Sequence, residues 1–265
     1  MSTHVTILGC GGSGGVPLPG GVDGRGYWGA CDPANPRNRR RRTSAMIVHQ
    51  GVRFLIDLSP DLREQLLSNR ITAVDAILMT HTHADHCHGI DDVRSLNFNT
   101  KAAVDLYAPH EILAGLHQRF GYVFTPLTAG NGDFYKPSLV PHTITPPTPF
   151  TVSGTNVQPF WQLHGKTQSV GYRLGNVAYS TDMNGIPPES EAFLKNLDLW
   201  IIDCLQPEPH YSHSHLALTL DLITHYQPKR AILIHMNHTL DYTSLAGIFT
   251  SGIQPGFDGS VVEVP

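Results

Sequence analysis

Apolar runs of strand type end repeatedly in histidine or aspartate, and this recurrence constrains the fold more than any other feature. One such run, "DAILMT" (75–80), leads directly into "HTHADH" (81–86). Three later residues of ligand type also follow apolar runs: His164, Asp182 and His235. Because the carboxyl ends of strands meet at one edge of a layered α/β protein, we expect these side chains to gather in one site.

Hairpins come first along the chain, and strands then alternate with helices. The turn at Gln50-Gly51 predicts a hairpin over 44–58, and Ser59 with Pro60 predicts the start of a helix over 59–70. Apolar spacing predicts further helices at 88–98, 111–121, 189–197, 216–226 and 240–249. Residues 122–155, rich in Pro, Thr and Gly, predict short strands at best. The order indicates an α/β (α+β) fold with mixed sheets and outer helices, in one domain over residues 1–265.

Composition argues against several classes of protein. Eighteen basic and 22 acidic residues give a formal net charge of -4, which does not favour nucleic acid or an anionic membrane as partner. No apolar stretch approaches the roughly 20 residues that cross a bilayer. The start has no signal-peptide pattern, and the four cysteines form no CxxC pair. We therefore expect a cytoplasmic protein without a membrane partner.

The spacing within "HTHADH" suits a pair of metal ions. His81 and His83 alternate along an extended chain and can share one ion, whereas Asp85 and His86 come from the following turn and can serve a second. Imidazole nitrogen and carboxylate oxygen bind Zn²⁺, Mn²⁺ or Fe²⁺. A solvated polar loop is the alternative, and it does not explain three histidines and an aspartate directly after a buried strand.

The full set, H-x-H-x-D-H followed by separated His, Asp and His, resembles the metallo-β-lactamase-like hydrolase superfamily. The resemblance implies an αββα sandwich of two mixed β-sheets flanked by helices, with a two-metal cleft at one edge. It assigns one metal, zinc or manganese, to His81, His83 and His164. It assigns the other to Asp85, His86 and His235, with Asp182 bridging the two. Asp57 matches an early aspartate that orients a ligand, or is a strand-end turn residue.

Three further stretches resemble the phosphoribosyl cyclic phosphate phosphodiesterase subfamily, which is related to ribonuclease Z. They are "RRRRTS" (39–44), "HMNHTLDY" (235–242) and "GIQPGFDG" (252–259). That subfamily holds a structural zinc with three cysteines and a histidine. Here Cys31 and His238 occupy two of these positions, while Gly26 and Trp28 fall near the other two. Because structural zinc is normally four-coordinate, we expect it to be missing, with Tyr27 and Trp28 packing in its place.

Candidates for catalysis follow from the same resemblance, and candidates for substrate binding follow from a run of arginines. A general acid is expected at His213, by counting back from His235, or at His215, by the local "SHL" pattern. Asp85 is expected to orient the attacking hydroxide held between two metals. Independently of the resemblance, arginine forks in "RNRRRR" (37–42) match phosphate oxygens, so Arg39 and Arg42 are candidate substrate contacts; the alternative is a solvated basic loop. The glycine-rich "GCGGSG" (9–14) is followed by prolines, so we interpret it as a loop near the cleft and not as a dinucleotide motif.

These features favour a binuclear metal-dependent phosphodiesterase acting on a small cyclic or nucleotide-like phosphodiester. The alternatives are a ribonuclease Z-like RNA endonuclease, a thioesterase or lactonase of the same fold, and a metal-binding protein without turnover. Nucleic acid is a less favoured partner than a small molecule, and a homodimer stays open.

Overall fold

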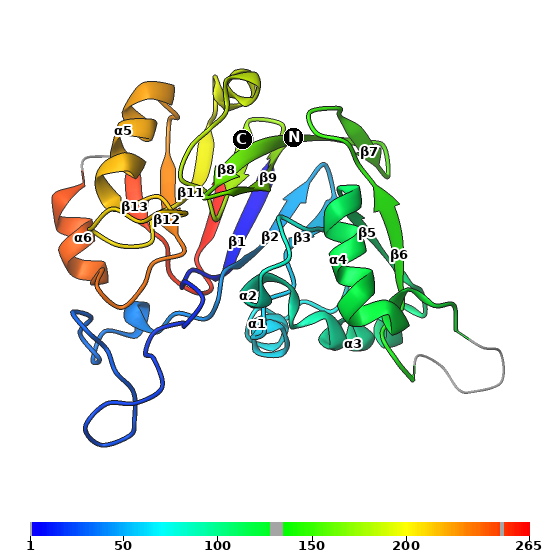
Figure 1. Cartoon of the computed structure of the whole chain (residues 1–265), viewed down its shortest axis with the longest axis horizontal. Helices are drawn as coiled ribbons and strands as arrows, with labels where there is room; N and C mark the ends of the chain where they lie inside the picture. The colour runs from blue at the N-terminus through cyan, green and yellow to red at the C-terminus, as the bar shows by residue number, and fades with distance from the viewer. Residues whose placement is uncertain (1, 128–134, 250–251) are drawn as a thin grey trace.

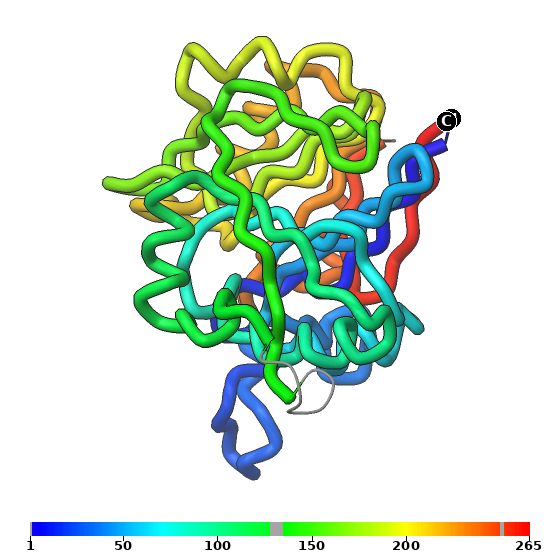
Figure 2. Tube along the Cα trace, turned by 90° about the vertical axis from the view of Figure 1, so that its right-hand side faces the viewer, coloured from blue at the N-terminus to red at the C-terminus, as the bar shows by residue number. Residues whose placement is uncertain are grey.

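The computed structural model describes residues 2–127, 135–249 and 252–265. Within them the chain forms two seven-stranded sheets that pack face to face, with helices on the two outer sides (Figure 1). The predicted αββα arrangement is therefore confirmed. The first and last strands pair antiparallel, Thr3 with Val264, and so the two termini lie together (Figure 2). No described helix combines the length and apolar character that a bilayer crossing requires.

The first sheet is antiparallel at one end and parallel at the other. Its strands, in spatial order, are β14 (Val261–Val264), β1 (Thr3–Gly9), β2 (Ser44–His49), β3 (Val52–Ile56), β4 (Ala76–Leu78), β5 (Val104–Ala108) and β6 (Leu139–Thr143). The hairpin between β2 and β3 turns at Gln50 and Gly51, whose φ angles are 52° and 83°. Two successive left-handed residues match the twist of a tight hairpin, as the sequence predicted. From β3 to β6 the strands run parallel.

The second sheet repeats this plan. Its strands, in spatial order, are β13 (Ile253–Pro255), β12 (Ala231–Ile234), β11 (Leu199–Asp203), β10 (Val177–Ser180), β9 (Thr167–Leu174), β8 (Thr155–His164) and β7 (Phe150–Val152). Strands β7 to β10 are antiparallel, and β10 to β13 are parallel. The parallel strands of both sheets therefore end at carboxyl termini that can gather loops at one edge.

The α-helices cover the outer faces of the sheets. They are α1 (Leu62–Ser68), α2 (Ala84–Cys87), α3 (Val93–Thr100), α4 (His110–Phe120), α5 (Leu216–Tyr226) and α6 (Tyr242–Ile248). Helices α1 to α4 lie beside the first sheet, and α5 and α6 beside the second (Figure 1). Short 3₁₀ turns occupy η1 (Pro36–Asn38), η2 (Ile90–Asp92), η3 (Gly121–Phe124) and η4 (Pro188–Leu194).

Three predicted helices differ from the structure. Helix α1 starts at Leu62, not at Pro60. A turn precedes it, in which the Ser59 hydroxyl accepts a hydrogen bond from the Asp61 amide. The segment 88–98 divides into a 3₁₀ turn and α3, and 189–197 is mostly 3₁₀. In 122–155 the expected short strands are β6 and β7, while 128–134 lie outside the described residues.

Candidate metal and catalytic site

The loop after β4 is fixed from the opposite sheet. The Tyr172 hydroxyl of β9 donates to the Met79 carbonyl at 2.6 Å, and the Val170 amide donates to the Thr80 carbonyl at 2.9 Å. Both bonds precede His81, so the second sheet determines where the histidine loop leaves the first. Buried hydrogen bonds of this kind are costly to break, which makes the loop a rigid support.

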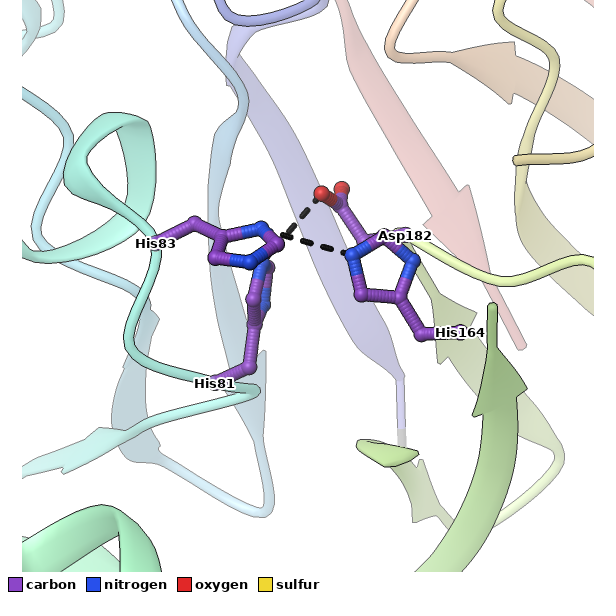
Figure 3. A group of neighbouring side chains, drawn as sticks. All are labelled: His81, His83, His164 and Asp182. Atoms are coloured by element: carbon purple, nitrogen blue, oxygen red, sulfur yellow. Dashed lines mark hydrogen bonds and ion pairs between the residues drawn. The ribbon is translucent and has the colours of Figure 1, made fainter. Parts of the chain in front are cut away.

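The first ligand group joins residues from both sheets. His81 and His83 follow β4, His164 ends β8, and Asp182 follows β10; one ligand atom from each lies within 4.8 Å of the others. His164 Nε2 lies 3.3 Å from His83 Nδ1, and His81 Nε2 lies 3.3 Å from Asp182 Oδ2 (Figure 3). The predicted set of three histidines and a bridging aspartate is thus brought together.

The second ligand group shares Asp182 with the first and adds Asp85, His86 and His235. His86 Nε2 lies 3.3 Å from Asp85 Oδ2 and 3.2 Å from Asp182 Oδ1. His235 Nδ1 lies 3.1 Å from the same Asp182 Oδ1. One oxygen of Asp182 therefore faces the first group and the other faces the second.

The chemistry of these groups fits divalent metal ions. The Nε2 atoms of His81 and His86 are buried and make no hydrogen bond, although carboxylate oxygens lie 3.2–3.3 Å away. Burying a polar atom without a partner costs about 1–3 kcal/mol, so two such atoms in one cluster indicate a missing ligand. Nitrogen and carboxylate donors at this density suit zinc or manganese.

Burial keeps several of the histidines in the form that binds metal. It lowers the pKa of His164 to about 4 and also lowers the pKa values of His83 and His235. These rings are consequently neutral near pH 7, as a metal ligand must be. Burial alone would raise the pKa of Asp182, but the adjacent histidines outweigh it and hold the pKa well below its usual range. The carboxylate is thus ionised and ready to bind a cation.

Three site residues adopt left-handed backbone conformations that glycine usually takes. Asp57, Asp182 and His235 follow β3, β10 and β12, and their φ angles are 61°, 51° and 61°. Such conformations cost of order 1–3 kcal/mol each for residues with a side chain. The same conformation recurs at three strand ends. This indicates that the placement of the side chain, and not local backbone stability, explains why Asp or His stands there instead of glycine.

Outer partners orient the histidine rings. Asp57 is fully buried and accepts hydrogen bonds from the amide and the hydroxyl of Thr80, each at 2.7 Å. It also lies 2.7 Å from His86 Nδ1. His164 Nδ1 similarly lies 2.7 Å from the Ser212 carbonyl. These contacts direct the opposite nitrogen, Nε2, toward the ligand groups. Of the two interpretations of Asp57, its position favours a partner of His86.

His213 and His215 separate clearly in space. His213 lines the cleft, and its Nε2 lies 4.0 Å from Asp182 Oδ2. His215 is the residue before α5, where its carbonyl accepts the Thr219 amide, and it does not line the cleft. The geometry therefore favours His213 as the acid.

Asp203, which the sequence reasoning missed, pairs with His213. Its Oδ2 lies 3.1 Å from His213 Nδ1 and accepts the Met183 amide at 2.9 Å. Burial lowers the pKa of His213, but Asp203 and the more distant Asp182 more than compensate and raise it to about 9. Asp203 ends the apolar strand "LWIID", the same position as Asp57, so the strand-end signal was present in the sequence.

A cleft of about 390 Å³ gives access to these groups. It is lined by Ser13, His83, Ala84, Asp85, Asp182, Leu205, His210, Tyr211, Ser212, His213 and His235. A larger groove of about 620 Å³ lies elsewhere, along α1 and α3, and contains none of the ligand residues. Although this groove is larger than the cleft, it is not the candidate reactive site, because none of the metal-ligand residues line it.

Neither of the two predicted arginine contacts lines the cleft itself. Arg39 covers the Trp28 ring, 5.1 Å from its centroid, and Arg42 Nε faces Asp61 Oδ2 at 3.2 Å. The neighbouring Arg40 is only 2% exposed and donates to the carbonyls of Leu240 and Asn237 at 2.6 and 3.0 Å.

The residues that pack around Cys31 and His238 are only partly the ones that the sequence predicted. Cys31 Sγ donates to the Leu240 carbonyl at 3.5 Å, and the His238 ring lies 5.2 Å from the Tyr27 ring. Arg40, which the sequence analysis did not single out, links Cys31 to the segment after His235. Tyr27 does pack on His238, whereas Trp28 packs on Arg39.

The sandwich and its ligand-rich edge define a hydrolase fold of the β-lactamase superfamily. Residues 52–236 match the family model described as "Beta-lactamase superfamily domain", and the chain belongs to that family. A solved structure titled "Crystal Structure of a New Diphosphatase from the PhnP Family" is 34% identical, with a TM-score of 0.89. The similarity covers 100% of this chain and 98% of that one.

Curated relatives match over part of their own length. An octanoyltransferase of Porphyromonas gingivalis is 34% identical over 256 residues, which are 96% of this chain and 50% of that protein. A ribonuclease Z of Treponema pallidum is 31% identical over 109 residues, 40% of this chain and 28% of the relative. The chain thus spans half or less of these relatives, and their names describe longer proteins.

Proposed function

We propose that this protein is a metal-dependent hydrolase of small phosphodiesters that binds two divalent ions, zinc or manganese. The observation that carries the proposal is the position of Asp182, whose two oxygens face two separate histidine groups at 3.1–3.3 Å. A disubstituted diphosphate is closely related, because each of its phosphorus atoms, like that of a phosphodiester, has two substituted oxygens and shares one negative charge between the other two. The similarity to the PhnP-family diphosphatase supports this class.

The ligand groups would hold the ions at the floor of the cleft. When bound, such ions offset negative charge on a phosphoryl oxygen and lower the pKa of water. Asp85 lines the cleft and carries a depressed pKa, because its histidine neighbours outweigh burial, so its carboxylate can accept a hydrogen bond from the attacking water. The ligand histidines keep their orientation through Asp57 and the Ser212 carbonyl.

His213 would donate the proton that the leaving group needs. The attacking water would release a proton to solvent as its oxygen bonds to phosphorus, the bond to the leaving oxygen would break, and that oxygen would take the His213 proton. Asp203 holds Nδ1 of the ring and keeps it protonated, which leaves Nε2 facing the cleft. General acid catalysis of this kind contributes about 10²–10⁴-fold to a rate.

Acyl transfer through a thiol receives no support from the structure. All four cysteines are buried, with at most 3% exposure, and burial raises the pKa of each. A nucleophilic thiol needs an accessible site and a lowered pKa. The transferase name also belongs to a protein of which this chain spans half. An RNA substrate is disfavoured by the net charge of -4.

The test is hydrolysis by metal-loaded protein of a panel: bis(p-nitrophenyl) phosphate, cyclic nucleotides, diadenosine diphosphate, a structured RNA and an acyl thioester. We expect turnover of the small phosphodiesters, and a loss of about 10²–10⁴-fold in His213→Ala. His215→Ala is the matched control and should retain wild-type activity. Turnover of the thioester alone, or equal effects of the two substitutions, would contradict the proposal.

A further inference from the structure

Ser13 lines the cleft beside the ligand groups, yet the proposed chemistry gives it no task. It lies in a β-turn that is closed by a 2.8 Å hydrogen bond from the Gly15 amide to the Gly12 carbonyl. Across residues 2–127, 135–249 and 252–265, the central amides of this turn, those of Ser13 and Gly14, donate to no protein acceptor. Successive unpaired amides in a turn form a concavity that binds anions.

The turn is held rigidly against the last ligand residue. The Met236 amide donates to the Cys10 carbonyl at 2.8 Å, and the Gly12 amide donates to the Met236 carbonyl at 3.3 Å. A methyl group at Gly12 would lie 3.1 Å from the Leu205 side chain and 3.3 Å from the His235 carbonyl. Glycine therefore permits the close approach that places Ser13 at the cleft.

Arg42 places a positive charge beside the same turn. A methyl group added at Gly15 would lie 3.8 Å from Arg42 Nη1. The Asp61 carboxylate accepts a hydrogen bond from the Arg42 backbone amide at 2.8 Å and faces Nε at 3.2 Å, which holds the side chain in place. The side chain is 30% exposed, so it can still reach a ligand. A planar guanidinium matches the spacing of phosphate oxygens.

We propose that the turn Gly12–Gly15 and Arg42 form a subsite for a second phosphoryl group, adjacent to the one that is cleaved. The inference rests on the proposed function and narrows it to phosphodiesters that carry another phosphoryl group nearby, such as disubstituted diphosphates. The amides of Ser13 and Gly14 and the Arg42 guanidinium bind the oxygens of this non-reacting group, while the reacting group would lie at the ions that the ligand groups hold.

The experiment compares substrates with one and two phosphoryl groups: bis(p-nitrophenyl) phosphate and diadenosine diphosphate. Ser13→Pro removes one amide and suits the second position of a turn, whereas the matched control Ser13→Ala keeps the amide. We expect Ser13→Pro and Arg42→Gln each to raise KM for diadenosine diphosphate by about 10–100-fold, with kcat little changed. Ser13→Ala should keep most of the affinity for diadenosine diphosphate that Ser13→Pro loses, and the exposed surface variant Arg63→Gln should behave like wild type.

The kinetics with bis(p-nitrophenyl) phosphate separate this inference from the proposed function. We expect Ser13→Pro and Arg42→Gln to lose much less activity on that probe than on diadenosine diphosphate, and Arg63→Gln to match wild type on both, with circular dichroism and metal content unchanged. Equal losses on both substrates in Ser13→Pro and Arg42→Gln, or no loss on either, would overturn the subsite. A wild-type protein inactive on both substrates would instead overturn the proposed function. If Ser13→Pro does not fold, Arg42→Gln decides the matter, since it leaves the turn intact.

Discussion

Asp203→Asn tests the pairing of Asp203 with His213 independently of catalysis. The substitution keeps the shape of the side chain but removes the negative charge 3.1 Å from His213 Nδ1. In the wild-type protein the pKa of His213 is raised from 6.5 to about 9. A raised histidine pKa stabilises the folded state fully below pH 6.5, and this contribution disappears as the pH rises through about 9.

The size of the effect follows from the same shift. One pKa unit corresponds to about 1.4 kcal/mol, and Asp182 shares the shift with Asp203. We therefore expect Asp203→Asn to lower the free energy of unfolding by about 1–3 kcal/mol near pH 6. Near pH 9.5 the ring is neutral in both proteins, so the difference should shrink or vanish.

Urea unfolding of the metal-free protein at both pH values measures this difference. His213→Gln provides the reciprocal control: in that background Asp203→Asn should show no dependence on pH between 6 and 9.5. A loss of stability of equal size at both pH values would refute the reasoning, because it would show that Asp203 acts through packing and its bond to the Met183 amide alone.

Four further expectations concern the metal site and its support. Asp182→Asn should lower the content of both ions, whereas His83→Ala should lower one, as elemental analysis would show. Asp57→Asn should weaken metal affinity about 10–100-fold in competition with a chelator, because it disturbs the His86 ring. Tyr172→Phe should lower the free energy of unfolding by about 1–3 kcal/mol in urea, since the buried Met79 carbonyl loses its donor. Wild-type protein should bind two metal ions per chain. A third ion in the elemental analysis would contradict the expectation that no structural zinc is bound.

Strand-end patterns predicted most of the site, and local helix signals were less reliable. Each predicted ligand follows an apolar run, and strands of a sheet bring such ends together whatever their distance in sequence. The helix predicted at 88–98 instead divides into a 3₁₀ turn and α3; the Gly89 amide before the turn donates to the Leu58 carbonyl at 2.9 Å, a tertiary contact that local propensity does not specify. Asp203 was missed although it ends a strand as Asp57 does, since no motif marked it.

The sequence by itself determined the family, the sandwich of two sheets and the chemical type of the ligands. The family and the sandwich follow from the resemblance of the H-x-H-x-D-H motif and the later His, Asp and His to a known superfamily, and the ligand type follows from residue identity. Only the tertiary structure decided that His213 and not His215 reaches the cleft, and that Asp203 holds the His213 ring. It also placed the Ser13 turn beside His235. Such distances depend on how two separate sheets pack, and no local pattern specifies that packing.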